Sequence, residues 1–189
     1  MSETWRCFVS VPIGAELRSS LADALVEWRT RPDLVALRWS DPGAWHVTLA
    51  FLGDTDPATI DDAAARLASL SDRHSSFELA TGGLGGFRSA ERARVAWYGV
   101  DDTQGRLGRL ADDVGRAVDL EPDRKFTAHL TLGRAIGRPI DLRGWIREAV
   151  PPEGALLVDR LDLMRSHIDR GPAHYETLIS VPLGVPRHE

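Results

Sequence analysis

Two short stretches of the chain carry the same set of residues that could do acid–base chemistry. Each contains His-x-Thr-Leu within an apolar run that closes on a glycine, with the polar residues at His46 and Thr48 and again at His129 and Thr131. Side chains alternate between the two faces of a strand. If both stretches are strands, each therefore presents an imidazole and a hydroxyl on one face.

The opposite face of each stretch is apolar. In the first stretch, the residues predicted to face away from the histidine are Trp45, Val47, Leu49 and Phe51. In the second, they are Ala128, Leu130 and Leu132. Each strand is therefore expected to bury one face in the core and to leave its polar pair free for a ligand.

Two histidines and two hydroxyls suit the cleavage of a phosphodiester without a metal ion. An imidazole titrates near pH 6.5, so one ring of a pair can accept a proton while the other donates one. Each positioned proton transfer contributes about 10²- to 10⁴-fold in rate. A threonine two residues along the strand, about 7 Å away, can donate a hydrogen bond to a charged oxygen.

Other interpretations of these residues are weaker. A single His-x-Thr is common by chance, and a lone histidine in a strand is usually structural, but two matched copies favour a shared site. Zinc sites need three or four His, Cys, Asp or Glu ligands, and threonine is a poor one. The remaining histidines are scattered, although His167 and His174 flank a turn through Gly171 and Pro172 and could approach each other. No Gly-x-Ser-x-Gly motif of a serine nucleophile is present. We expect no metal and no cofactor.

Hydrophobic periodicity predicts the elements that position these strands. Further strands are expected at 6–11, 34–39, 77–84, 94–100, 155–158, 161–166 and 175–182. Helices are expected at about 15–29, from Pro57 to Leu70 with Asp56 as its N-cap, from the Asp101-Asp102 cap to Val118, and at 141–150. The glycine-rich segment Gly82-Gly83-Leu84-Gly85-Gly86 is interpreted as a flexible turn region without the lysine that a phosphate-binding P-loop requires.

This order of elements predicts an α+β fold with antiparallel sheets, since strands and helices do not alternate strictly. The strand-helix-strand-strand block before residue 73 is echoed between 77 and 134. Such a duplication would place the two His-x-Thr strands in equivalent positions, facing across one cleft. The 189 residues are expected to form a single domain, 1–189, with two lobes.

Composition narrows the functional class. A net charge of −5 argues against coating long RNA or DNA, which needs a basic field. No apolar run approaches the roughly 20 residues of a membrane helix. The single cysteine, Cys7, excludes an internal disulfide and suits a reducing compartment, so a cytoplasmic location is expected. The sequence does not indicate the oligomeric state, and a monomer is the default expectation.

The motifs resemble those of the 2H phosphoesterase superfamily, and specifically the bacterial RNA 2',3'-cyclic phosphodiesterases, historically called 2'-5' RNA ligases. The similarity runs nearly from end to end, and the first His-x-Thr motif is its most specific part. The segments that carry it are Arg6-x-Phe8, Arg38 to Gly53, Gly86-Phe87 with Arg94-Val95-x-Trp97, Phe126 to Arg134, and Leu161 to Ser166 with Gly171 and Tyr175. One departure is Ala128, where the family commonly has proline.

The resemblance implies a bilobal fold of two pseudo-twofold related lobes with the active site in the central cleft. It implies metal-independent hydrolysis of a 2',3'-cyclic phosphate to a 2'-phosphate, with reverse 2'-5' ligation on suitable ends. Carried over by position, His46 is the proton donor and His129 the proton acceptor. Thr48, Thr131 and Arg134 bind the phosphate. Strict alternation would turn Arg134 away from His129, so its role requires the strand to end or twist after Gly133.

The expected substrates are RNA ends with a 2',3'-cyclic phosphate or small cyclic nucleotides. The alternatives are another cyclic or 2'-5' linked phosphodiester, or a protein that binds a nucleotide or RNA end without catalysis. Four aromatic residues are candidates to stack on the base, although core packing is the favoured role of each: Phe8, Phe87, Trp39 and Trp45.

Overall fold

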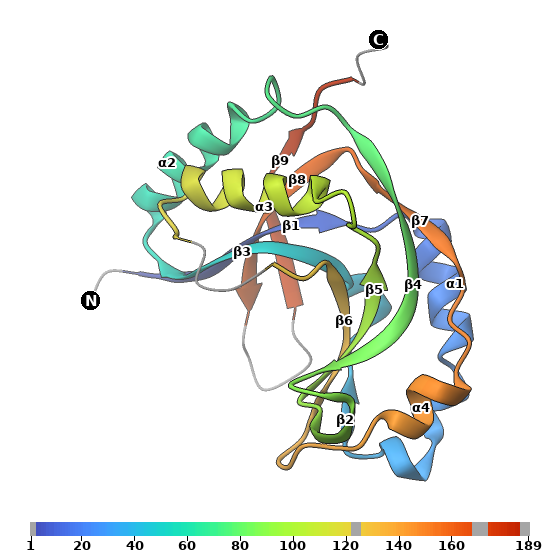
Figure 1. Ribbon diagram of the computed structural model, residues 1–189. Helices are drawn as coiled ribbons and strands as arrows, with labels where there is room; N and C mark the ends of the chain where they lie inside the picture. The colour runs from blue at the N-terminus through green and yellow to red at the C-terminus, as the bar shows by residue number, and fades with distance from the viewer. Residues whose placement is uncertain (1–2, 122–125, 168–173, 186–189) are drawn as a thin grey trace.

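The protein is described by a computed structural model that covers residues 3–121, 126–167 and 174–185. Gly171 and Pro172, which the sequence places in a turn, lie outside these ranges. The fold is α+β, built on one nine-stranded sheet with helices packed around it (Figure 1). No helix in the described ranges is long and apolar enough to cross a membrane.

Strands and helices follow one another in the order that the periodicity predicts. They are β1 (Trp5–Pro12), α1 (Ala15–Ala24), β2 (Leu37–Trp39), β3 (His46–Thr55), α2 (Pro57–Ala68), β4 (Phe77–Phe87), β5 (Val95–Val100), α3 (Arg106–Ala117), β6 (His129–Ala135), α4 (Arg143–Glu148), β7 (Gly154–Val158), β8 (Arg160–His167) and β9 (His174–Pro182). Short 3-10 helices lie at Trp28–Thr30, Pro32–Leu34, Pro42–Ala44 and Ala90–Arg92.

The sheet consists of two halves that meet at the two histidine strands. Its order is β7-β4-β5-β6-β3-β1-β8-β9, and β2 also pairs with β6. Neighbouring strands are antiparallel, and in the described residues one register pair, Val47 on β3 with Leu130 on β6, joins the two halves of the sheet. Each half therefore has four main strands with its histidine strand innermost. The predicted α+β class with antiparallel strands is confirmed, and the strands of the two halves form one continuous sheet.

The helices begin largely where their capping residues predict. The Asp56 carboxylate accepts a hydrogen bond from the Thr59 backbone N–H (3.1 Å) as α2 begins at Pro57. The Asp102 carboxylate accepts from two backbone N–H groups in the first turn of α3. Helix α1 is shorter than predicted and ends at Ala24, because the chain tightens into 3-10 turns before Pro32, which holds the preceding residue extended.

The apolar faces of β3 and β6 are buried with one exception. One continuous core includes residues from both histidine stretches: Trp45, Val47 and Leu49 from the first, and Ala128, Leu130 and Leu132 from the second. Phe51 was predicted to lie in this core, which is wrong, since 62% of its surface is exposed. The β1–β3 register shifts twice along this stretch. Such irregularities interrupt the two-residue alternation of a strand.

The glycine-rich segment 82–86 is not a turn but part of β4, which contradicts the sequence interpretation. Its composition is explained by Trp97 on the adjacent strand β5. A Cβ on Gly85 would lie 2.0 Å from the Trp97 indole, so the ring lies flat against a backbone that has no side chain. Gly83 adopts a φ of +73° where the β4–β5 register shifts.

Replacing Gly85 by alanine is expected to destabilise the fold by about 1–3 kcal/mol, the cost of overpacking a tight contact. Gly82→Ala is the matched control, because nothing lies within 4 Å of a Cβ at that position. Urea denaturation measures both free energies of unfolding. In a Trp97→Leu background the difference between the two variants should shrink. Equal stabilities of Gly85→Ala and Gly82→Ala would contradict the proposed contact.

Candidate active site

The four polar residues of the two motifs come together where the halves of the sheet meet. Val47 and Leu130 form the pair that joins β3 to β6, and both are fully buried. In an antiparallel pair, the residue before one partner lies next to the residue after the other. His46 therefore neighbours Thr131, and His129 neighbours Thr48. All four project from the face opposite the buried pair.

Each imidazole is held by the same backbone hydrogen bond. Nδ1 of His46 lies 2.8 Å from the carbonyl oxygen of Ala44, and Nδ1 of His129 lies 2.7 Å from that of Thr127. A carbonyl oxygen only accepts, so Nδ1 carries the proton in both rings. Among the described residues no hydrogen bond engages Nε2 of either ring, so Nε2 can accept a proton when the ring is neutral or donate one when it is charged.

Burial lowers the pKa of both histidines. The pKa of His46 falls to about 4, mainly because burial disfavours the charged ring, with further lowering by His129 and Arg134. Burial is also the main reason that the pKa of His129 is lowered, and Arg134 contributes again. In both rings the hydrogen bond to the backbone carbonyl raises the pKa and so opposes the effect of burial. Both rings are therefore neutral in the free protein near pH 7, and an anion between them would raise their pKa.

Arg134 lies close enough to influence both histidines because β6 carries an irregularity. Thr131 pairs with Trp97 and Gly133 with Ala96, so one extra residue, Leu132, stands between these two pairs. The extra residue shifts the alternation by one, so that Arg134 projects from the same face as Thr131. The sequence analysis expected the strand to twist or end after Gly133 if Arg134 was to face the site. The structure places the irregularity at Leu132, just before Gly133.

Aromatic rings flank the His46 side of the site. Phe8 on β1 stacks on the His46 ring with centroids 4.8 Å apart, and Tyr175 on β9 meets that ring edge-on at 5.2 Å. The exposed Phe51 lies 6.1 Å from Phe8. Sequence reasoning did not single out Phe51 as a site residue, because strict alternation assigned it to the core.

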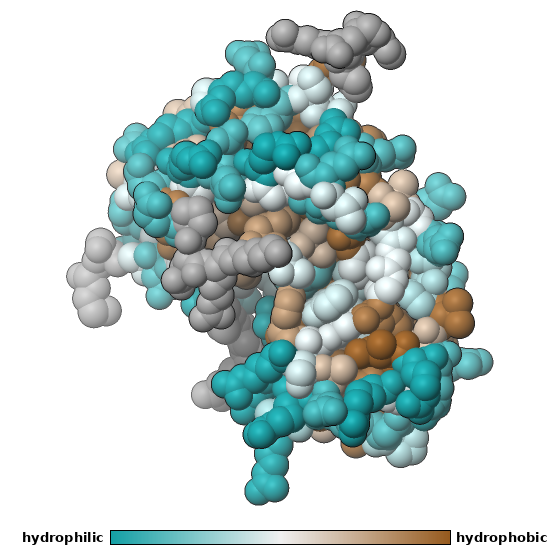
Figure 2. Space-filling model, viewed as in Figure 1, coloured by the Kyte–Doolittle hydropathy of each residue, from teal (hydrophilic) through white to brown (hydrophobic). Residues whose placement is uncertain are grey.

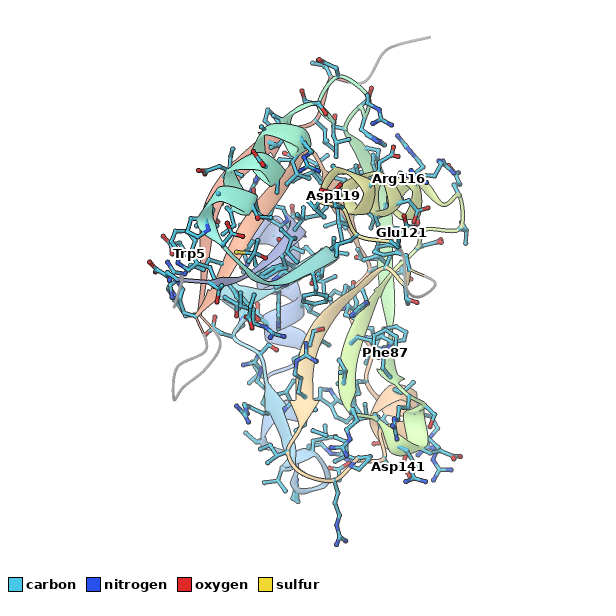
Figure 3. All side chains as sticks on the ribbon, turned by 90° about the vertical axis from the view of Figure 1, so that its left-hand side faces the viewer. Trp5, Phe87, Arg116, Asp119, Glu121 and Asp141 are labelled. Carbon is cyan, nitrogen blue, oxygen red and sulfur yellow. The ribbon has the colours of Figure 1, made fainter. Side chains whose placement is uncertain are left out.

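The His129 side has its own aromatic neighbours. Phe87 on β4 meets His129 edge-on at 4.7 Å and lies 5.7 Å from Trp97. Figure 3 shows Phe87 midway along the strands, between the α3 end of the molecule and the α4 end. Of the four aromatic candidates, the structure brings Phe8 and Phe87 to the histidines. Trp45 is buried in the core, and Trp39 packs edge-on against Trp145.

The other histidines in the described ranges make local contacts outside this site. Nε2 of His74 lies 2.9 Å from the Asp113 carboxylate. His167 and His174 do approach each other across the β8–β9 pair, with ring centroids 5.4 Å apart, and His167 contacts Glu176. Among the residues that the structure describes, no three His, Cys, Asp or Glu side chains form a group that could hold a metal ion.

Comparison with known proteins identifies the family. The model of the LigT-like phosphoesterases matches residues 16–97, which include the first motif. An RNA 2',3'-cyclic phosphodiesterase of Aeropyrum pernix is 32% identical over 174 residues, covering 88% of this chain and 93% of that protein. One of Geobacillus stearothermophilus is 27% identical over 95% of this chain, and the chain spans 58% of that relative's length.

Solved structures agree with this relationship. Escherichia coli LigT in apo form superimposes with a TM-score of 0.74 at 25% identity, covering 97% of this chain and 99% of LigT. The same protein in complex with 3'-AMP superimposes with a TM-score of 0.76 at 24% identity, over 96% and 99% of the two chains. With a full-length relative above 30% identity and the shared fold, the chain belongs to the LigT-like phosphoesterase family of the 2H phosphoesterase superfamily.

Proposed function

We propose that the protein hydrolyses the 2',3'-cyclic phosphodiester of RNA ends or nucleotides to a 2'-phosphate, without a metal ion. The observation that carries this proposal is the pair of imidazoles at the β3–β6 junction, each fixed through Nδ1 with Nε2 free. The names of the relatives, RNA 2',3'-cyclic phosphodiesterases, support the same substrate.

In the proposed reaction the two histidines have opposite roles. Nε2 of His129 takes a proton from water, whose oxygen attacks phosphorus, while Nε2 of His46 donates a proton to the departing O3'. The bond from phosphorus to O3' breaks and the phosphate stays on O2'. The hydroxyls of Thr48 and Thr131 and the guanidinium of Arg134 bind the non-bridging oxygens, where charge develops in the transition state.

The substrate itself supplies the protonation state that this scheme needs. His46 is neutral in the free protein near pH 7, since its pKa is about 4. An anionic phosphate next to the ring favours the charged form and raises that pKa. Binding and proton uptake are therefore coupled, and His46 becomes an acid when the phosphate is in place.

The reverse reaction follows from the same arrangement. A 5'-hydroxyl in place of water would lose its proton to His129 and attack the cyclic phosphate, leaving a 2'-5' linkage and a free 3'-hydroxyl. The family resemblance supports this ligation as a secondary activity of the same site.

Incubation with a 2',3'-cyclic nucleotide is expected to yield the 2'-phosphate alone, at a rate that EDTA does not change. Chromatography against authentic 2'- and 3'-phosphates checks the position of the phosphate. A large loss of activity in EDTA that added metal restores would contradict the metal-free scheme. Tight binding of the 2'-phosphate with no turnover would instead indicate a nucleotide-binding protein.

A further inference from the structure

Arg38 on β2 and Arg134 on β6 form an arginine pair in which the two residues stand directly opposite each other. They are register partners where the two strands run antiparallel, so both side chains project from the same face of the sheet. The Cβ atoms of such partners are about 4.5–5.5 Å apart. Both residues are exposed. Since Arg134 faces the histidines, Arg38 lies on the same side of the sheet, beside the proposed phosphate site.

The residues on either side of Arg38 fix its direction. Leu37 is buried, and Trp39 packs edge-on against a buried tryptophan of α4. Just after the strand, the Ser40 backbone N–H donates to the Leu132 carbonyl of β6 (2.8 Å). Because side chains alternate along a strand and both neighbours turn toward the core, Arg38 projects from the opposite face.

Two arginines placed in this way repel each other unless an anion lies between them. Like charges directly opposite on neighbouring strands destabilise a sheet. Among the described residues, neither guanidinium of the arginine pair forms an ion pair with a carboxylate. The arrangement therefore favours an anion that comes from a ligand.

The carboxylates at the α4 end of the molecule pair with other arginines. Arg143 contacts both Glu91 (3.0 Å) and Asp141 (2.7 Å). Glu148 is held by two further arginines. Figure 2 shows hydrophilic side chains gathered at this end of the molecule. The positive charge of the arginine pair is thus not neutralised by these acidic neighbours.

The two members of the arginine pair differ in their effect on the histidines. The charge of Arg134 lowers the pKa of both His46 and His129, whereas that of Arg38 contributes to neither shift. Arg38 therefore lies farther from the imidazoles than Arg134 does. It is placed for an anion next to the reacting phosphate rather than for that phosphate itself.

We propose that Arg38 binds a second phosphate of the substrate, the one on the 5' side of the terminal nucleotide, while Arg134 binds the cyclic phosphate. This assignment rests on the proposed function and narrows its substrates to RNA ends and 5'-phosphorylated nucleotides. The two phosphates are separated by a single ribose, and a guanidinium can hold each through two parallel hydrogen bonds. A pair of local charges is sufficient for this recognition in a protein whose net charge is −5.

The test compares adenosine 2',3'-cyclic phosphate with and without a 5'-phosphate. The 5'-phosphorylated form is expected to have a kcat/KM about tenfold higher, as for one additional charge-assisted contact. In Arg38→Gln the two substrates should be cleaved with equal efficiency. Arg38→Lys should keep part of the preference, because lysine retains the charge but not the fork. The ratio of the two kcat/KM values is the readout, since a general change in activity cancels.

A dinucleotide that ends in a 2',3'-cyclic phosphate separates recognition of charge from contacts with the second base. With a normal inner phosphodiester it should be preferred over adenosine 2',3'-cyclic phosphate. With an uncharged methylphosphonate at the inner linkage this preference should be lost, although both bases are present. Added salt should also weaken the preference, because it screens exposed charges.

Arg116→Ala is the matched control. Arg116 is an exposed residue of α3, at the other end of the molecule from Asp141 (Figure 3), and it pairs with Asp113. Its loss should leave the ratio of the two substrates unchanged. Calorimetry with the products gives a readout without turnover: adenosine 2',5'-bisphosphate should bind about tenfold more tightly than adenosine 2'-phosphate to the wild type, but not to Arg38→Gln.

Three results would overturn the proposal while leaving the proposed function intact. The first is hydrolysis with no preference for the 5'-phosphate. The second is a preference that persists in Arg38→Gln. The third is an equal loss with both substrates in that variant, which would place Arg38 on the reacting phosphate. An absence of hydrolysis with every substrate would instead refute the proposed function, and the calorimetric comparison would still decide whether Arg38 binds the second phosphate.

Discussion

Replacing His129 or His46 by alanine is expected to slow hydrolysis of a 2',3'-cyclic nucleotide by about 10²- to 10⁴-fold in each case. Each change removes an Nε2 that the proposed scheme uses for proton transfer. The two rings act on one transition state, so the double variant should be little slower than the slower single variant. Steady-state kinetics on the three variants measure this directly.

Replacing His46 or His129 by asparagine distinguishes a loss of catalysis from a loss of folded structure. Its amide can donate to the carbonyl of Ala44 or Thr127 as Nδ1 does, but it has no group equivalent to Nε2. Asparagine variants should therefore fold like the wild type and be nearly as slow as the alanine variants. His167→Ala, which loses a contact with Glu176 away from the site, is the histidine control. Wild-type rates in either asparagine variant would rule out the acid–base roles.

Arg134→Ala is expected to lower kcat/KM by about 10²- to 10³-fold, the usual effect of losing one donor to a developing oxyanion. Arg134→Lys should recover part of this loss, because lysine retains the charge but not the two-pronged guanidinium. Arg138→Ala, in the turn that follows β6, is the matched arginine control. Full activity of Arg134→Ala would remove Arg134 from the proposed site.

Arg134→Ala should also change the pKa values of both histidines. Burial is the main cause of their low pKa values, and the positive charge of Arg134 lowers both further. Removing that charge favours the protonated rings, so the pKa of His46 should rise from about 4 and that of His129 should also rise. The acid limb of kcat/KM against pH, which reports the free enzyme, should move to higher pH. NMR titration of the ring protons checks the direction, and unchanged values would show that Arg134 does not face the pair.

Local patterns in the sequence were sufficient to predict most of the architecture. The alternation around His46 and His129 placed the adjacent residues Val47 and Leu130 in the core, because a strand between core and solvent needs one apolar face. The Asp56 and Asp102 caps depend on nearby backbone groups, so they could also be read from neighbouring residues.

The errors lie where neighbouring strands alter a local pattern. Phe51 leaves the core because β3 is irregular against β1. For Arg134 the sequence indicated that the strand must change direction, but only the pairing with β5 shows that Leu132 is the extra residue. The glycines of β4 resemble a turn until Trp97 from β5 is placed on Gly85. Each irregularity depends on the pairing partner, which no window of sequence contains.

The sequence by itself determined the chemistry that the protein could support: two imidazoles and two hydroxyls on the polar faces of two equivalent strands. Only the tertiary structure decided how these groups are combined. Pairing of Val47 with Leu130 joins the two motifs, the carbonyls of Ala44 and Thr127 orient the rings, and burial lowers their pKa. The physical reason is that residue type and alternation are local properties, whereas strand pairing, desolvation and charge proximity arise only when distant segments meet.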